Sequence, residues 1–566
     1  MPVCGGGGPL RGLREGQAQV RREVETGTMA MDSAAARTRG RVVMLVDNGV
    51  NGDSRVQKAA RSAAEAGWEV ILLGRSPVAE GKTWQLGRAQ VRLLSMPAPL
   101  ARRRHEFRRA WLRWPLAYPP NGVAPYRQQA VKAWQADLAV RAAQLAVAGP
   151  ATPRLGLRRW ALRVEQSAAR LTKTWVSGRH WMLTQARVRR RFRHPWDRLY
   201  TMFWQAVKGD GSWRRLEPGL WDYELAYGPV VDGLRPDLIH ANDFRMLGVA
   251  SRAKLRAAAN GRDIKVVWDA HEFLPGIKPW QDHARWLPGN LAHEREYVPY
   301  ADAAVTVSDG LAELLVREHS LVTVPEVVLN APAVDSGDLW ADAPVPDLRA
   351  ACGIGPDVPL LVYSGTAARQ RGLDTMVEAL PQLPGVHAAL VVNRPNGPYM
   401  AEVRATAARL GVADRVHVLP YVAHWQVVPY LAGADAGIIP IHHWPNHEIA
   451  LITKFFEYSH ARLPLVVSDV KTMADTVRST GQGEVFRAEE VADYVRAVRA
   501  VLAQPERYRA AYDRPGLLES WTWEAQAKVL DSVYHRLLPA SPSAADLAGV
   551  QSAAQEGEQP AAGVVP

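Results

Sequence analysis

The sequence predicts an α/β protein built from two facing doubly wound domains. Short apolar runs alternate with stretches of helical character in two separate parts of the chain. Such alternation is typical of parallel sheets covered by helices on both faces. A polar, proline-rich segment at residues 331–358 separates the two series, so we place the domain boundary there. With 566 residues, 47% of them hydrophobic, the chain is long enough for two packed cores.

The first series opens with the apolar run at residues 41–47, which we expect to be a buried strand. A glycine-containing loop follows, and Asp53 or Ser54 would cap a helix that we expect over residues 55–66. The next strand is predicted at residues 69–74 and completes a βαβ unit. Further strands are predicted at residues 237–242, 265–272 and 303–309.

The second series begins after the proline-rich segment. Its strands are predicted at residues 359–365, 387–393, 415–420, 436–441 and 464–469, with helical segments between most of them. Open α/β sheets bind ligands outside the carboxyl ends of their strands, and a cleft between two such domains is a typical small-molecule site. We therefore expect the functional residues in the loops that follow these strands.

Composition sets the limits of the domains. Residues 1–38 and 541–566 are rich in small and polar residues without a sustained period, and we expect both tails to be disordered. The first domain is expected at residues 39–335 and the second at residues 336–520. A helix at residues 521–540 would then cross back to the first domain.

Composition also indicates the compartment. The two cysteines, Cys4 and Cys352, lie far apart in the sequence, which argues against a disulfide framework and suits a reducing compartment. The chain has no run of 18 apolar residues that could span a bilayer. Its first residues lack the apolar centre of a secretory signal. We therefore expect a cytoplasmic protein.

The positive charge of the chain is concentrated in one block. Residues 101–220 hold 25 Lys and Arg against 6 Asp and Glu, together with 9 of the 20 tryptophans, whereas the whole chain has a formal charge of +12. This block interrupts the first series of strands, so we expect a basic, tryptophan-rich helical insertion in the first domain. Nucleic-acid binding is not expected, because no RNP, zinc-finger or helix-turn-helix pattern accompanies the charge.

One predicted helix of this insertion is amphipathic and cationic. Its apolar stripe consists of Trp160, Val164, Ala168, Leu171 and Trp175, and the cations beside the stripe are Arg158, Arg159, Arg163, Arg170 and Lys173. Two interpretations stay open. Either the stripe packs on the first domain while the cations face water, or the helix binds an anionic membrane as a peripheral protein on the inner face of the cell membrane.

Two loops of the first domain carry groups of chemical interest. Gly49 and Gly52 follow the first strand but do not fit G-x-G-x-x-G, so a nicotinamide cofactor is not expected. A glycine loop ahead of a helix N-terminus can let an anion or a substrate approach backbone amides, and a plain turn is the alternative. His271 and Glu272 end the strand at residues 265–272, where open sheets present reactive groups.

Two runs of the second domain carry charged groups at comparable places. After Gly365, the run YSGTAARQRGL leaves a strand and starts a helix, with Arg369 and Arg371 in the turn. Cations at such a turn suit a diphosphate. In the run KFFEYSHARLPLVVSD, residues 454–469, Glu457 lies near the start of a helix, where an open α/β sheet binds the sugar hydroxyls of a nucleotide. A solvated glutamate on an ordinary helix is the alternative.

Taken together, these runs resemble the retaining glycosyltransferases of the GT-B fold, family four, over about residues 41–538. DSRVQKAARSAAEAGWEV resembles the opening helix of the family, VVWDAHE its mid-domain strand end, and ADAAVTVSDGLAELL with VVLNAP the approach to the interdomain linker. YSGTAARQRGLDTMVEAL resembles the pattern G-R-x-x-x-x-K-G, with Gly365 and Gly372 at matching spacing. KFFEYSHARLPLVVSD resembles the region of the donor-binding glutamate. The resemblance implies two Rossmann-like domains and a nucleotide-sugar donor.

The resemblance also assigns roles to single residues. It implies that Glu457 binds the ribose hydroxyls of the donor, that Arg371 binds the diphosphate in the position of the family's lysine, and that His271 lies beside the transferred sugar. The donor site would further include Gly49, Gly52, Gly365, Thr366, Arg369 and Lys454.

This sequence departs from the family pattern at two positions. Thr366 stands where the family often has a second cation, so phosphate binding would rest on Arg371 with Arg369 or Lys454. The family's other glutamate would fall at Ile449. Glu448 is one residue away, and either a small loop shift lets it contact the sugar as a catalytic residue or that role is lost.

By the same resemblance we expect transfer of a hexose with retention. A lipid-linked or cell-surface glycan is the expected acceptor, since membrane binding by the basic block would place the cleft beside a lipid-linked one. No carboxylate stands out as the nucleophile of a double displacement, so we expect reaction on one face, with the donor phosphate oxygen taking the acceptor proton. The chain has no Asp-x-Asp pair, and we expect neither an essential metal nor a cofactor. A nucleotide-sugar epimerase and a non-catalytic module that binds membrane or nucleic acid remain alternatives.

Overall fold

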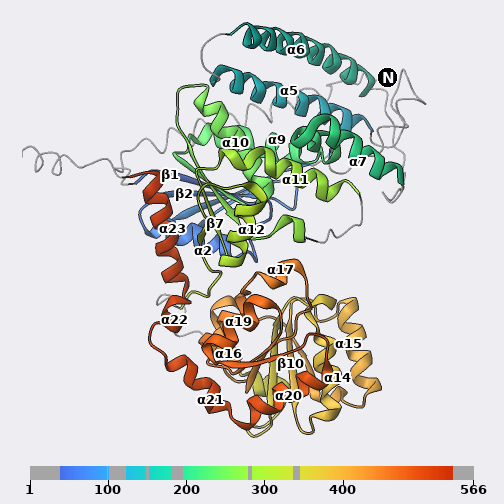
Figure 1. The fold of residues 1–566 in the computed structure, drawn as a ribbon, viewed down its shortest axis with the longest axis vertical. Helices are drawn as coiled ribbons and strands as arrows, with labels where there is room; N and C mark the ends of the chain where they lie inside the picture. Colours follow the sequence, from blue (N-terminus) through green and yellow to red (C-terminus); the bar gives the residue numbers. More distant parts are fainter. Residues whose placement is uncertain are drawn as a thin grey trace, which may run out of the picture.

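Two sheets, each with helices on both faces, lie one above the other in the computed structural model (Figure 1). The structure describes residues 39–97, 100, 123–147, 152–180, 195–277, 284–334 and 344–539. The α/β fold of two doubly wound domains that the sequence predicts is therefore confirmed. The tails expected to be disordered, and parts of the basic block, lie outside the described residues.

The first domain is built on a sheet whose described strands follow the order β3-β4-β2-β1-β5-β6-β7-β8. Their bounds are β1 Arg41–Leu45, β2 Glu69–Arg75, β3 Lys82–Leu86, β4 Ala89–Leu94, β5 Leu238–Asn242, β6 Lys265–Ala270, β7 Ala303–Thr306 and β8 Glu326–Val327. All pair in parallel except β3, which runs antiparallel to β4. The sequence does not reveal β3, because this edge strand is mostly exposed and has no apolar run.

The second domain contains a parallel sheet in the order β11-β10-β9-β12-β13-β14. The bounds are β9 Leu360–Gly365, β10 His387–Val392, β11 Val416–Leu419, β12 Ala436–Ile439, β13 Leu465–Ser468 and β14 Gly483–Phe486. In each sheet the strand order reverses beside the first strand of the series, between β1 and β5 and between β9 and β12. Ligands of open α/β sheets bind at the carboxyl ends of strands at such a reversal.

Helices cover both faces of each sheet. In the first domain they are α2 Ser54–Glu65, α9 Leu220–Leu234, α10 Asp243–Ala258, α11 Trp286–Tyr297 and α12 Asp309–His319. In the second they are α13 Leu348–Cys352, α14 Leu373–Ala379, α15 Pro398–Arg409, α16 Val427–Leu431, α17 Pro445–Glu448, α18 Thr453–His460, α19 Lys471–Thr480, α20 Val491–Ala503 and α21 Pro505–Arg509. Asp53 caps α2 by accepting a hydrogen bond from the amide of Val56, as the sequence predicts.

The last described helices return the chain to the first domain. After α22, Leu517–Ser520, helix α23, Trp523–Leu537, packs against α2 (Figure 1). Its residues Trp523, Leu530 and Tyr534 are buried in one core cluster with strands β1 and β2. The described chain thus joins the domains twice, through the segment after β8 and through α22–α23.

The described parts of the basic block are helical. They are α5 Val123–Val147, α6 Pro153–His180, α7 Pro195–Lys208 and α8 Trp213–Leu216. Helix α6 lies on α5 at the end of the first domain that points away from the second domain (Figure 1). The tryptophans of the block have unlike environments, since Trp213 is fully buried beside Trp221 whereas Trp160 is 63% exposed. Among the described residues, no helix is long and apolar enough to cross a membrane.

Helix α6 turns its apolar stripe to solvent. Trp160, Val164, Leu171 and Trp175 are between 51% and 75% exposed. The face covered by α5 is a second, narrower one at seven-residue spacing, formed by Leu155, Leu162, Ala169 and Val176. The interpretation in which the stripe packs on the first domain is therefore wrong, because α5 covers the narrow face of α6 and the side chains of the wider stripe are mostly exposed.

Candidate functional site

A cleft of about 1370 Å³ lies between the two domains. The first domain contributes the end of the β1–α2 loop, helix α2 and the residues after β6, and the second contributes the residues after β9 and the start of α18. The cleft brings together seven predicted site residues: Gly52, His271, Gly365, Thr366, Arg371, Lys454 and Glu457. Gly49, Arg369 and Glu448 are not among the described residues that line it.

Gly365 and Lys454 form a close pair at the end of β9. The backbone of Gly365 has a φ of 149°, and a Cβ atom there would lie 2.2 Å from Lys454 Nζ, so only glycine lets the lysine approach. Lys454 Nζ lies 4.7 Å from the centre of the Tyr363 ring. Burial and, to a lesser degree, the charge of Arg371 lower the pKa of Lys454 to about 7, although Glu457 opposes the fall. This amine would regain its full charge beside a bound anion.

Glu457 projects from α18 into the cleft, and the aromatic residues around it hold the helix in place. Phe455, Phe456 and Tyr458 are buried, and the Tyr458 hydroxyl accepts a hydrogen bond from the amide of Ser364 at 2.7 Å. Burial raises the pKa of Glu457, while Lys454 and Lys58 oppose the rise. Within the described ranges the carboxylate makes no hydrogen bond or close ion pair, so its oxygens are available to a ligand.

Arg371 and Arg369 point to different places. The short turn Arg369–Arg371 ends at Gly372, which has a φ of 67° and whose Cβ would lie 1.9 Å from the carbonyl oxygen of Pro440. This packing brings Arg371 into the cleft. Arg369 instead forms an ion pair with Glu402 and is 69% exposed. The expectation that Arg369 lies in the donor site therefore has no support in the geometry.

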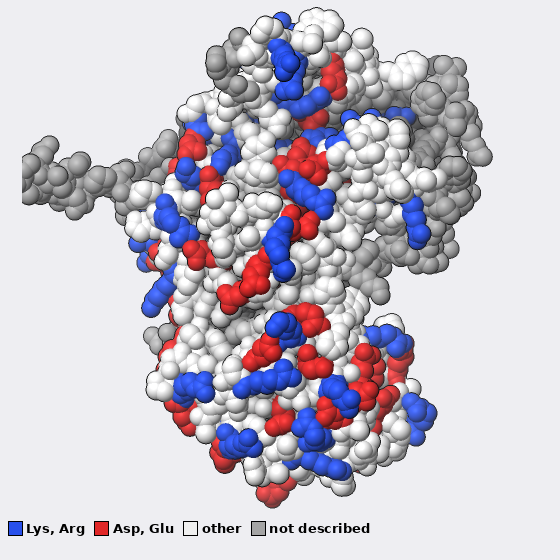
Figure 2. Space-filling view, in the orientation of Figure 1, with Lys and Arg blue, Asp and Glu red and all other residues white. Residues whose placement is uncertain are grey.

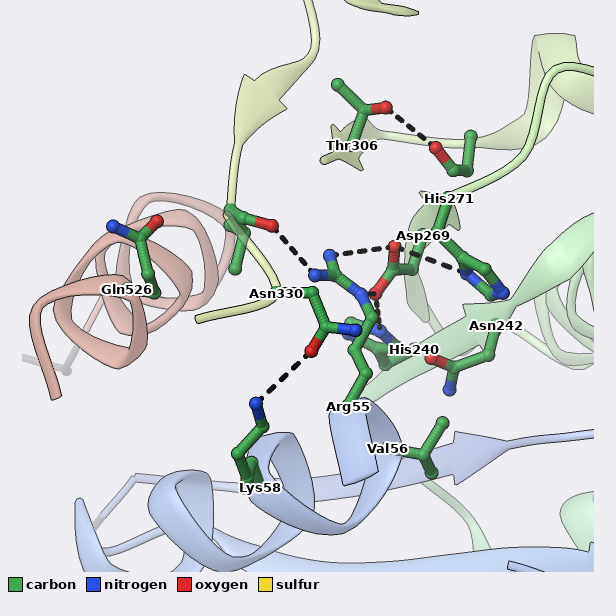
Figure 3. Close-up of polar contacts among 12 residues, drawn as sticks. Arg55, Val56, Lys58, His240, Asn242, Asp269, His271, Thr306, Asn330 and Gln526 are labelled. Carbon is green, nitrogen blue, oxygen red and sulfur yellow. Dashed lines mark hydrogen bonds and ion pairs between the residues drawn. The ribbon is translucent and has the colours of Figure 1, made fainter. Parts of the chain in front are cut away.

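His271 lies at the cleft after β6 and is 28% exposed. Its Nδ1 atom lies 3.7 Å from Asp269 Oδ1, the distance of an ion pair rather than of a hydrogen bond (Figure 3). Burial by itself would lower the pKa of His271, but the adjacent Asp269 carboxylate raises it to about 9. At neutral pH the ring is therefore an imidazolium, which can donate to a substrate oxygen.

Glu448 is held away from the cleft. One carboxylate oxygen lies 2.6 Å from His443 Nδ1, and the other accepts a hydrogen bond from the amide of Lys471. Ile449, where the family's second glutamate would fall, packs against the core of the first domain, and its carbonyl accepts a hydrogen bond from Ser308. Of the two outcomes left open from the sequence, this arrangement favours loss of that glutamate's role. Both oxygens of the Glu448 carboxylate are already engaged, by His443 and by the amide of Lys471.

The loop between β1 and α2 is closed by its own polar groups. Asn48 donates to Asp53 Oδ2 at 2.7 Å and accepts from the amide of Val50 at 2.8 Å. Gly52, with a φ of 86°, lies at the edge of the cleft, whereas Gly49 does not reach its lining in the described structure. The plain-turn alternative thus describes Gly49, and Gly52 alone is placed where a ligand could approach.

Lys58 is a site residue that sequence reasoning missed. Its ammonium group lies in the cleft, bonds Asn330 Oδ1 at 3.2 Å and the carbonyl of Ala331, and lies 4.8 Å from the centre of the Trp523 ring. Burial and, to a lesser degree, the charge of Arg55 lower the pKa of Lys58 to about 7. No local signal could have revealed this lysine, because its partners lie far along the chain. Within the described structure no group of three or more His, Cys, Asp and Glu is placed to hold a metal ion.

The arrangement suits a ligand with a diphosphate and neighbouring hydroxyls. Arg371 and Lys454 supply positive charge on one side of the cleft, and Glu457 supplies an acceptor for hydroxyls close by. Carboxylates pair well with two adjacent hydroxyls, and cations with phosphate oxygens. His271 faces the same space from the other domain.

Comparison with known proteins identifies the family of the chain. Residues 205–331 match the family model described as Glycosyltransferase Family 4, and residues 345–514 match Glycosyl transferases group 1. The glycogen synthase of Mycobacterium tuberculosis (strain CDC 1551 / Oshkosh) is 26% identical over 314 residues, which cover 53% of this chain and 69% of that protein. The D-inositol 3-phosphate glycosyltransferase of Geodermatophilus obscurus is 25% identical over 354 residues, covering 56% and 76%.

Solved structures show the same fold. The sucrose-phosphate synthase of Thermosynechococcus elongatus superposes with a TM-score of 0.56 at 16% identity, covering 89% of this chain and 100% of that one. A glycosyltransferase of Rickettsia africae superposes with a TM-score of 0.50 at 10% identity and the same coverage. With a family 4 match in its first domain and a group 1 match in its second, the chain belongs to the GT-B glycosyltransferases of the family 4 type.

Proposed function

We propose that the protein transfers a hexose from a nucleoside-diphosphate sugar to a hydroxyl of a lipid-linked or cell-surface glycan, with retention of the anomeric configuration. The observation that carries the donor assignment is the set of groups at one wall of the cleft. The Arg371 guanidinium and the Glu457 carboxylate make no side-chain hydrogen bond or ion pair with the rest of the described chain, and the buried Lys454 amine lies beside them. Charged groups left unpaired in a cleft are typical of a ligand site.

The proposed donor lies across the second domain. Glu457 accepts hydrogen bonds from the ribose hydroxyls, while Arg371 and Lys454 hold the diphosphate and stabilise the charge that develops as it leaves. The sugar then points toward the first domain, where the His271 imidazolium donates to one of its oxygens. Fixed charges that are already in place need no reorganisation during the reaction, which is the main way such a site lowers the barrier.

Retention requires the acceptor hydroxyl to attack on the face that the diphosphate leaves. In the proposed reaction the new bond from the acceptor oxygen to the anomeric carbon forms as the bond to phosphate breaks, and a phosphate oxygen takes the acceptor proton. A double displacement would need a carboxylate beside the anomeric carbon. Glu272 lines the cleft next to His271, so Glu272→Gln is the variant that separates the two routes. We expect it to keep most of its activity and to form no covalent glycosyl-enzyme.

The experiment that tests the donor assignment is a thermal-shift screen with a panel of nucleotide sugars. A ligand that binds the native state raises the melting temperature in proportion to the logarithm of its concentration over its Kd. The sugar nucleotide that stabilises the protein is then incubated with and without glycan acceptors. A transferase releases nucleoside diphosphate only when an acceptor is present, whereas an epimerase converts the sugar nucleotide without releasing it.

Peripheral attachment to an anionic membrane is part of the proposed function. The exposed stripe on α6 extends from Leu157 through Trp160, Val164, Ala168 and Leu171 to Trp175, which is about five turns at 3.6 residues per turn. A stripe with that period stays on one side of a straight helix, whereas a coiled-coil seam repeats every 3.5 residues. The stripe therefore suits a flat apolar surface better than a second helix.

The charges beside the stripe match anionic lipid headgroups. Arg158, Arg163, Arg170 and Lys173 are exposed, and the single acidic residue of α6, Glu165, is paired with Arg141. Elsewhere on the face shown in Figure 2, acidic and basic side chains are interspersed over both domains, which does not favour an extended nucleic-acid surface. Because α6 lies at the end of the first domain away from the cleft (Figure 1), we expect the enzyme to act on the glycan end of a lipid-linked acceptor.

Liposome co-sedimentation tests this attachment. We expect the protein to bind vesicles that contain anionic lipid and to be released by salt, because such attraction decays over a Debye length of about 10 Å at 0.1 M. Replacing Trp160 and Leu171 by serine should abolish binding. Replacing Leu162, on the face that packs on α5, should instead disturb the helix pair. Equal binding to neutral and anionic vesicles, or to neither, would contradict the proposal.

A further inference from the structure

A buried carboxylate lies directly behind His271. Asp269, in strand β6, is 2% exposed, and its two oxygens accept hydrogen bonds from Arg55 Nε at 2.9 Å and from the Arg55 Nη2 atom at 3.0 Å (Figure 3). Each oxygen also faces one histidine. Oδ1 lies 3.7 Å from His271 Nδ1, and Oδ2 lies 3.4 Å from His240 Nε2. One carboxylate thus stands among three nitrogen-bearing side chains from three elements.

Neither His271 Nδ1 nor His240 Nε2 has a hydrogen-bond partner within the described structure, although both atoms are buried. A buried polar atom left unpaired destabilises the fold, so native proteins rarely leave one without a reason. A carboxylate has about four acceptor sites, and Arg55 occupies two of those on Asp269. The remaining sites face the two histidines just beyond hydrogen-bond distance. A small movement of the His271 ring would complete the bond.

The same cluster touches both connections between the domains. Arg55 donates through its Nη1 atom to the carbonyl of Val328 at 2.7 Å, at the start of the segment that leads to the second domain. His240 Nδ1 lies 2.7 Å from the hydroxyl of Tyr534, on the returning helix α23. Any rotation of one domain on the other must bend one of these two segments. A single side chain links each segment to Asp269: Arg55 for the first and His240 for the second.

We propose that Asp269 is the positioning residue of His271, holding Nδ1 toward its carboxylate and leaving Nε2 to donate to the transferred sugar, with closure of the cleft completing the Asp269–His271 hydrogen bond. This role rests on the proposed sugar transfer. The carboxylate itself does not touch the substrate, since it lies behind the ring and is buried. When Nδ1–H donates to the carboxylate, Nε2 donates only while the ring is an imidazolium, the form that the Asp269 charge favours.

The charges around His271 make this role measurable. Besides Asp269 and the neighbouring Glu272, the groups that face the ring are Asp243 at the start of α10 and Arg55 on α2. Burial and Arg55 both favour the neutral ring, whereas Asp269 and, to a lesser degree, the Asp243 charge favour the imidazolium. Asp269→Asn keeps the shape and one of the two hydrogen bonds that Asp269 accepts from Arg55, but it removes the charge. His271 should then titrate at a lower pH.

The test is a nuclear magnetic resonance titration of ring-labelled histidine in the full chain, with the His271 signal assigned through His271→Asn. We expect a midpoint near the pKa of about 9 in the native protein, and a fall of at least one unit in Asp269→Asn. The titration needs neither donor nor acceptor, so its outcome is independent of the proposed function. A native midpoint below about 7.5, close to that of an ordinary histidine, would overturn the proposal even if the variant fails to fold.

A matched control separates positioning from stability. Glu224 is also buried in the first domain, where it accepts a hydrogen bond from Arg252 at 2.7 Å, but it does not contact His271. Glu224→Gln should lower stability and leave the His271 midpoint unchanged. Once the donor sugar nucleotide is identified, the pH–rate profile can be measured. Its alkaline limb should move to lower pH in Asp269→Asn only. A shift of equal size in both variants would show a general structural effect and overturn the assignment.

Discussion

Replacing Glu457 by glutamine should weaken donor binding while leaving the empty protein as stable as before, or more so. The carboxylate lies in the cleft without a hydrogen bond or close ion pair in the described part of the chain, so the amide breaks no internal contact. Burial raises the pKa of Glu457, which means that the fold disfavours its ionised form. We therefore expect opposite effects on binding and on stability, which a merely structural residue would not produce.

The size of each effect follows from the chemistry. A hydrogen bond to a charged acceptor contributes about 1.5–3 kcal/mol, and the amide keeps one of the two acceptor oxygens. Loss of one such bond corresponds to a roughly 10- to 150-fold higher Kd. For stability, the folded-state pKa of Glu457 lies above the unfolded value, so the folded protein binds more protons between the two. Stability from this group falls as pH rises through that window, and at neutral pH the substitution removes a destabilising charge.

The assay is calorimetric titration with the sugar nucleotide found by screening, alongside thermal unfolding of the empty proteins. Glu448→Gln is the matched control, because Glu448 lies nine residues earlier and outside the cleft, where it holds His443 and the amide of Lys471. That variant should lose stability and keep donor affinity. If Glu457→Gln binds the donor as tightly as the native protein, or if Glu448→Gln is the one that loses affinity, the placement of the donor is refuted.

Three further predictions follow from the same geometry. Arg371→Ala should lower turnover by about 100-fold or more, because it removes a fixed charge at the leaving diphosphate. Arg369→Ala removes an exposed ion pair with Glu402 and a contact with the Tyr399 ring, and it should stay near native turnover in the same assay. At pH 8, binding of nucleoside diphosphate should take up protons, because Lys454, with its pKa of about 7, regains its charge. Calorimetry in two buffers of different ionisation enthalpy measures this proton uptake. Lys454→Met should abolish most of it. Gly372→Ala should lower the free energy of unfolding in urea by more than about 3 kcal/mol, since its Cβ would lie 1.9 Å from a backbone oxygen. Gly411→Ala, with a similar φ of 69° but open space around it, should lower it by about 1 kcal/mol.

Much of the fold was readable from the sequence, because buried parallel strands need continuous apolar runs and the strand-to-helix turns need glycine or a cap. The runs that became β1, β2, β9 and β13 are of this kind, and so is Gly365, whose positive φ and close approach to Lys454 no other residue allows. Strands with little burial gave no such signal. The edge strand β3 was not predicted, because a mostly exposed strand has no apolar run.

The sequence by itself therefore determined the two domains, the strand-end loops and the candidate residues at their ends, since each depends on neighbours within a few positions. Only the tertiary structure decided which of them meet. Arg371 and Arg369 differ by two positions, yet only Arg371 enters the cleft. Asp269 is held by Arg55, which lies 214 positions away along the chain. Likewise, α6 exposes its wider apolar face because α5 covers the narrower one. The direction of a side chain and its partners depend on packing between distant segments, which no local pattern contains.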